Sequence, residues 1–70
     1  MRLIINGKEE IIEKESLNIT DLLEIKEVKM PDMVTVELNG EIIDRENFSK
    51  VYLKDNDTIE FLYYMGGGSI

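Results

Sequence analysis

The sequence contains no cysteine, no histidine and only one proline. Without cysteine, no disulfide can stabilise the fold and no thiolate can hold a metal ion. Without histidine, the chain lacks the side chain that most often acts as a general base or metal ligand near neutral pH. The fold must therefore be held by packing alone, and any chemistry must come from carboxylates, hydroxyls, amines or a chain terminus.

Length and charge narrow the class of protein further. Seventy residues are enough for one domain, which buries about 60% of its unfolded surface and is therefore modestly stable. With 15 acidic and 8 basic residues the formal charge is −7, which repels nucleic acid and attracts a positively charged partner. No apolar run approaches the ~20 residues that span a bilayer, and the opening is too short for a signal peptide. We expect a cytoplasmic protein that does not bind membranes.

Two Asn-Gly pairs predict two β-hairpins. Asn-Gly favours a type I′ turn, because both residues tolerate a positive φ. The first pair, at 6 and 7, separates predicted strands over residues 2–6 and 8–13. The second pair, at 39 and 40, follows the alternating run 34–38 and precedes a short strand over 41–43.

The stretch between the hairpins predicts the main helix, from Ile19 to about Glu27. Asn18 is a favourable N-cap residue, and Asp21 can complete a capping box with it. Pro31 limits any extension beyond the predicted end.

The second half of the chain predicts a helical turn at 45–48, an extended piece at 51–53 and a final strand over 58–65. We expect that strand to lie beside the first strand and parallel to it. The helix can then cover one face of the resulting sheet. The predicted fold class is α+β, a ubiquitin-like β-grasp with a mixed four- to five-stranded sheet and one main helix. The β-grasp domain would span residues 1–65, and residues 66–70 would form a flexible glycine-rich tail.

Three polar candidates each have a simpler explanation. The cluster 55–57 could be half of a cation loop, but Asp and Asn also form turns by bonding to their own backbone. An acidic run could be a docking patch or the charged side of an exposed edge strand; it comprises Glu9, Glu10, Glu13 and Glu15. Arg45 could hold a partner's carboxylate, or pair within its own turn.

The end of the final strand is the strongest candidate for partner binding. Aromatic residues and methionine are enriched at the centres of protein interfaces, and the strand ends with Phe61, Tyr63, Tyr64 and Met65. Alternation places Tyr63 and Tyr64 on opposite faces, so that one of them is expected to be exposed.

Three glycines follow, at 66, 67 and 68. They could be a frayed terminus or an engineered linker. Alternatively, they form a thin tail that threads into another protein's active site. A terminal carboxylate is also a reactive group that a chain without cysteine and histidine can still offer.

The sequence resembles the ThiS/MoaD family of ubiquitin-like sulfur carriers, nearest to its thiamin-biosynthesis branch. The resemblance covers nearly the whole chain: the opening "RLIING", the helix "NITDLLE" and the half "VTVELNGEIIDRENFSKVYLKDNDTIEFLYYMGGG". Elements similar to the family pattern are Asn39, Ile43, Arg45, Phe48, Asp55, Asp57, Ile59 and Gly67-Gly68.

The resemblance implies a protein substrate and not an enzyme. An adenylating enzyme of the ubiquitin-activating type would use ATP and Mg²⁺ to activate the carboxylate of Gly68, with Gly66 and Gly67 as threading backbone. A cysteine desulfurase or rhodanese-type donor would then supply sulfur, leaving a thiocarboxylate for thiazole synthase. No cofactor is expected to be bound to the carrier itself.

One departure from the family pattern is the presence of Ser69 and Ile70 after the glycines. A carrier would need a peptidase to remove them first. Other sulfur acceptors remain open, namely molybdopterin, a tRNA base or a cysteine precursor. So does a non-catalytic β-grasp interaction module that never uses its tail.

Overall fold

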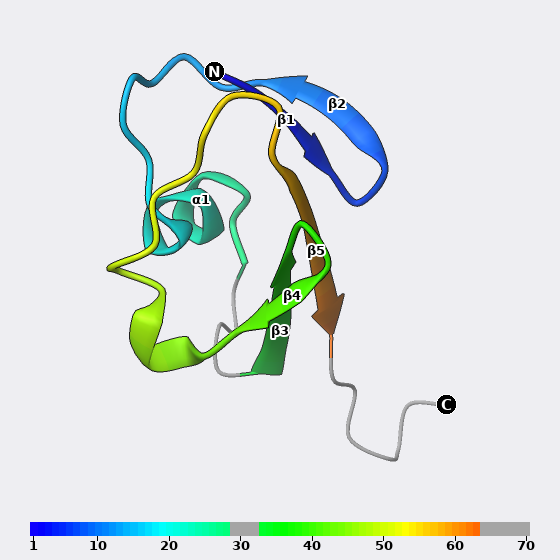
Figure 1. Cartoon of the computed structure of the whole chain (residues 1–70), viewed down its shortest axis with the longest axis vertical. Coiled ribbons are helices and arrows are strands. Elements are labelled where there is room, and N and C mark those ends of the chain that lie inside the picture. Colours follow the sequence, from blue (N-terminus) through cyan, green and yellow to red (C-terminus); the bar gives the residue numbers. More distant parts are fainter. Residues whose placement is uncertain (29–32, 64–70) are drawn as a thin grey trace.

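The computed structural model describes residues 1–28 and 33–63. Their elements are β1 (Arg2–Ile5), β2 (Lys8–Ile11), α1 (Ile19–Ile25), β3 (Val34–Leu38), β4 (Glu41–Ile43), the 3₁₀ turn η2 (Arg45–Asn47) and β5 (Thr58–Tyr63). The strands form one five-stranded sheet in the order β2-β1-β5-β3-β4 (Figure 1). β5 is central, parallel to β1 and antiparallel to β3. This is the expected α+β β-grasp fold.

Both Asn-Gly pairs form the predicted turns. Asn6 and Gly7 have φ values of 52° and 84°, and Asn39 and Gly40 have 51° and 88°. Positive φ at both central positions gives a turn whose twist matches that of the flanking strands. The first hairpin is shorter than predicted, because β1 stops where the turn begins at Asn6 and β2 ends at Ile11.

Helix α1 begins where predicted. The Asn18 side-chain oxygen accepts a hydrogen bond of 2.7 Å from the Asp21 N–H, and the Asp21 carboxylate accepts one of 3.4 Å from the Asn18 N–H. The helix ends at Ile25, earlier than predicted, and the chain reverses at Glu27, whose φ is 58°. Lys26 is the C-cap residue of α1, and its Nζ lies 2.7 Å from a carboxylate oxygen of Glu10 on β2.

The predicted extended piece at 51–53 lies against the entry to α1. The Leu53 N–H donates to the Leu17 carbonyl at 2.8 Å, and the Ile19 N–H donates to the Val51 carbonyl at 3.2 Å. The turn that follows is stabilised by its own acidic residue, since the Lys54 N–H donates to Asp57 at 2.8 Å. The structure therefore supports the turn interpretation of residues 55–57.

The core lies between α1 and one face of the sheet. Its buried side chains are Leu3, Ile5, Ile12, Leu17, Ile19, Leu22, Leu23, Val34, Val36, Phe48, Leu53, Ile59 and Phe61. The other face of the sheet, called the open face below, is not covered by α1. Among the described residues, no helix is both long enough and apolar enough to cross a membrane.

Candidate functional site at the end of β5

The central position of β5 determines where the chain leaves the sheet. β5 is paired on both sides, with Ile5 opposite Ile59 on β1 and Val34 opposite Tyr63 on β3. Figure 1 shows β5 ending at the edge of the molecule far from the N-terminus. The pairing with β1 ends at Ile59, so the last residues of β5 are held by β3 on one edge and, at Phe61, by the Asn6 side chain on the other.

Several predicted site residues lie outside the described residues. These are Tyr64, Met65, Gly66, Gly67 and Gly68. The predicted tail over 66–70 lies there too. Their roles remain predictions, and the described site consists of β5 and the surfaces beside it.

Both turn asparagines hold β5 in place, which the sequence analysis did not predict. The Asn39 side-chain oxygen accepts a hydrogen bond of 2.9 Å from the Thr58 N–H. The Asn6 side-chain oxygen accepts one of 2.8 Å from the Phe61 N–H. Each asparagine thus forms a hairpin turn and also anchors the strand that leads to the glycines.

Phe61 supports the site from within the core. Its side chain is 7% exposed, on the face of β5 that α1 covers. In this position it presents little surface to a partner, and its predicted part in partner binding is untested. For Tyr63 the structure describes the backbone pairing with Val34.

An apolar patch that the sequence analysis missed lies on the open face next to the end of β5. Leu62 is 46% exposed and Ile42 is 65% exposed. They lie on the two sides of β3. Leu62 on β5 is opposite Thr35 of β3, and Ile42 on β4 is opposite Glu37, two residues after Thr35 on β3. The sequence does contain a sign of this exposure. Alternation along β5 places Leu62 on the same face as the polar Thr58 and Glu60, and on the opposite face from the buried Ile59.

Two carboxylates add negative charge to this patch. Glu37 and Glu60 are direct cross-strand neighbours on the open face. Like charges opposite each other destabilise a sheet, and a basic group of a partner placed between them would relieve the repulsion. We call the set Leu62, Ile42, Glu37 and Glu60 the exit patch.

Arg45 lies at the same end of the sheet as the end of β5. Its η2 turn follows β4 directly, with β3 and β4 between it and β5 (Figure 1). Arg45 is exposed and lines a shallow depression with Asp44 and Glu46. Arg45 is thus at the same end of the molecule as the end of β5, on the opposite side of β3 from it, and its part in partner binding stays a prediction.

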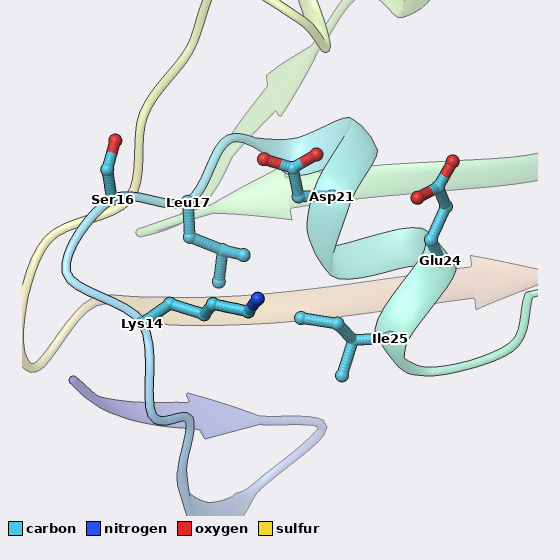
Figure 2. Close-up of a pocket in the computed structure, with 6 residues that line it drawn as sticks. All are labelled: Lys14, Ser16, Leu17, Asp21, Glu24 and Ile25. Atoms are coloured by element: carbon cyan, nitrogen blue, oxygen red, sulfur yellow. The ribbon is translucent and has the colours of Figure 1, made fainter.

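A separate cleft of about 210 Å³ lies between α1 and the loop before it. Figure 2 shows Lys14 extending along this cleft toward Ile25, while the carboxylates of Asp21 and Glu24 point away from Lys14. Asp21 also caps the helix. These side chains are not aimed at a common point, so we place the candidate site at the end of β5.

The chain is similar to known proteins over nearly its whole length. The model of the ThiS family matches residues 1–68. A sulfur carrier protein ThiS of Bacillus subtilis is 39% identical over 66 residues, which covers 94% of this chain and 98% of that protein.

Solved structures of a thiamine biosynthesis protein (ThiS) from Geobacter metallireducens are also similar. The crystal structure has a TM-score of 0.88 and 51% identity, and covers 97% of this chain and 100% of that one. The solution structure has a TM-score of 0.83 and 49% identity, and covers 100% of this chain and 91% of that one.

Proposed function

The chain belongs to the ThiS family, and on that premise we propose that it carries sulfur as a thiocarboxylate on Gly68. The observation that carries the proposal is the extent of the family match, which runs from residue 1 and ends at Gly68. The fold is consistent with this role, since the central strand β5 leads toward that glycine. The protein is then a substrate that moves between enzymes and not itself a catalyst.

The proposed chemistry begins with the Gly68 carboxylate, which is a poor electrophile and must be activated. A partner adenylating enzyme, with ATP and Mg²⁺, joins the Gly68 carboxylate to AMP and releases pyrophosphate. The terminal sulfur of a persulfide, on a cysteine desulfurase or rhodanese-type donor, attacks the acyl carbon and expels AMP. A thiol then cleaves the S–S bond and leaves the thiocarboxylate, which delivers its sulfur to thiazole synthase.

The three glycines suit passage through a narrow channel. Glycine has no Cβ, so the backbone can approach an enzyme closely. Fixing each residue costs about 1–2 kcal/mol of backbone entropy. Contacts made by the folded domain must offset this cost, and the exit patch is the surface placed to make them.

The exit patch fits a partner surface that places a basic group opposite the Glu37–Glu60 pair and apolar groups opposite Leu62 and Ile42 on either side of it. Burying the exposed parts of Leu62 and Ile42 removes apolar surface from water and so favours binding. Basic groups opposite Glu37 and Glu60 speed association and select the orientation. We propose that the adenylating enzyme and the sulfur acceptor both bind here, one after the other.

Ser69 and Ile70 must be removed in this scheme, because the reactive carboxylate belongs to Gly68. The test compares three forms: the full chain, a chain ending at Gly68 and a control ending at Gly67. Each is incubated with the adenylating enzyme, ATP, Mg²⁺ and a persulfide donor, and its intact mass is measured. Only the form ending at Gly68 should exchange one oxygen for sulfur; equal masses before and after in all three forms would refute the proposal.

A non-catalytic interaction module is the second candidate, because the exit patch belongs to the folded domain and is independent of the tail. The two functions predict different effects of deleting residues 66–70 on biological activity. A module would keep its biological activity in a complementation assay, whereas a carrier would lose it completely. Partner binding measured in parallel shows whether the shortened chain still folds and docks.

A further inference from the structure

The two turn asparagines are matched in structure but contact β5 at different places. Asn6 and Asn39 each hold the first position of an Asn-Gly turn, with φ values of 52° and 51°, and both are exposed. The Asn39 side-chain oxygen accepts from the Thr58 N–H at the start of β5, whereas that of Asn6 accepts from the Phe61 N–H near its end. A role that Asn6 has and Asn39 lacks must therefore come from the place where Asn6 contacts β5.

β5 continues past the end of its pairing with β1. The parallel pairing ends with Ile5 opposite Ile59, whereas β5 runs on to Tyr63 (Figure 1). The Asn6 N–H donates to the Ile59 carbonyl at 2.9 Å, and Phe61, two residues later, faces the same edge because backbone groups alternate in direction along a strand. Among the hydrogen bonds described on this edge, the one from Phe61 to the Asn6 side chain lies nearest to the glycines.

Phe61 is held from three directions. Its side chain lies in the core at 7% exposure, its backbone is opposite Val36 of β3, and its N–H is bound by Asn6. Leu62, the next residue, is opposite Thr35 of β3, and its side chain is 46% exposed. In the part of the chain that the structure describes, Phe61 is thus the last residue of β5 with a contact on each edge of the strand.

We propose that Asn6 is a positioning residue for the carrier reaction, because its hydrogen bond to Phe61 fixes the point from which the chain leaves the sheet. The inference rests on the proposed function and adds to it a residue that acts through β5. Without the bond, the last residues of β5 can bend away from the sheet, and the adenylating enzyme must order them together with the glycines. Each residue that is ordered on binding costs conformational entropy. The loss of Asn6 therefore weakens productive binding of the tail.

Asn39 separates this role from a role in stability alone. Besides accepting from Thr58, the Asn39 side chain donates to an Asp57 carboxylate oxygen at 3.0 Å. Asn39→Gly therefore removes two side-chain hydrogen bonds at the start of β5, and Asn6→Gly removes the one to Phe61. Glycine tolerates the positive φ at both positions. If the two asparagines acted only on stability, the change at Asn39 should be at least as harmful as the change at Asn6.

The experiment measures kcat/KM for adenylation of the chain ending at Gly68, at a temperature where every variant is folded. We expect Asn6→Gly to lower kcat/KM about fivefold, which corresponds to the net contribution of one hydrogen bond. Asn39→Gly should leave kcat/KM unchanged although it lowers the free energy of unfolding at least as much. Asn6→Asp keeps an acceptor oxygen and should restore kcat/KM. Without any enzyme, the ¹⁵N heteronuclear NOE of the Leu62 amide should fall in Asn6→Gly and not in Asn39→Gly.

Other outcomes would overturn the inference. An equal loss of kcat/KM in Asn6→Gly and Asn39→Gly would leave Asn6 as a stabilising residue only. Unchanged kcat/KM in Asn6→Gly would show that the end of β5 needs no anchor on this edge, and a loss that Asn6→Asp does not restore would show that the acceptor oxygen is not the cause. These results differ from a failure of the proposed function, in which the unsubstituted chain ending at Gly68 is itself not adenylated and the inference is refuted with it.

Discussion

The side-chain oxygen of Asn6 accepts a hydrogen bond of 2.8 Å from the backbone N–H of Phe61. In the parallel ladder of β1 and β5, the Asn6 N–H donates to Ile59 at 2.9 Å, and the Asn6 carbonyl would be the next acceptor in line. At Asn6, however, the chain has a φ of 52° and turns away from β5. The side chain replaces the carbonyl and extends the ladder by one hydrogen bond toward the end of β5.

Replacing Asn6 by glycine should therefore loosen β5 without harming the turn. Glycine tolerates the positive φ but has no acceptor, so we expect a loss of about 1 kcal/mol in the free energy of unfolding. Hydrogen exchange of the Phe61 amide should accelerate. The control Asn6→Asp keeps an acceptor oxygen and should keep the Phe61 amide protected. Equal exchange in both variants would show that this hydrogen bond does not hold the strand.

A negative charge in the exit patch should impair the carrier reaction. Leu62→Glu and Ile42→Glu place a carboxylate beside Glu60 and Glu37, where we propose that partners dock. We expect kcat/KM for adenylation to fall about tenfold or more in each. Both residues are exposed, so circular dichroism should show an intact fold. Ile11→Glu, on an exposed residue of the edge strand β2, is the control and should leave adenylation unchanged.

Helix α1 offers a matched pair of apolar residues that should differ in their effect on stability. Leu22 is 0% exposed, whereas Ile25 is 40% exposed. Leu22→Ala removes side-chain atoms from a packed core and should cost about 2–5 kcal/mol. Ile25→Ala should cost clearly less, because part of that side chain is already in water. Urea unfolding measures both, and similar losses would contradict the packing of α1 described above.

The N-terminal cap of α1 should contribute about 1 kcal/mol to the free energy of unfolding. Asn18→Ala removes the acceptor for the Asp21 N–H and the donor to the Ser49 carbonyl. Asn18→Ser keeps a capping oxygen and should recover most of the loss in thermal unfolding. Thr20→Ala, on an exposed helical residue, serves as the control and should have little effect. A destabilised serine variant would point to the Ser49 contact as the more important one.

Much of the fold was predictable because its signals are local. An Asn-Gly pair requires particular φ values at two adjacent residues, and both predicted turns formed. The capping pair Asn18 and Asp21 lies within one helical turn, and the start of α1 was correct. The end of α1 was predicted too late, because the reversal at Glu27 has no glycine or proline to mark it.

The candidate site was predictable only in part. The aromatic residues of β5 indicated a binding surface, but the alternation that buries Phe61 exposes Leu62. Ile42 joins Leu62 only through the pairing of β4 with β3 and of β3 with β5. No single stretch of sequence contains that patch.

The sequence by itself determined the turns, the strand alternation, the start of the helix and the resemblance to a family of sulfur carriers. These depend on backbone preferences and spacings within a few residues. Tertiary structure decided the partners of each element: the Asn6 side chain on Phe61, the exit patch beside β3, and the segment 51–53 against the entry to α1. The physical reason is that such contacts join residues far apart in the chain, and they form only when burying the shared core offsets the entropy of closing the intervening loops.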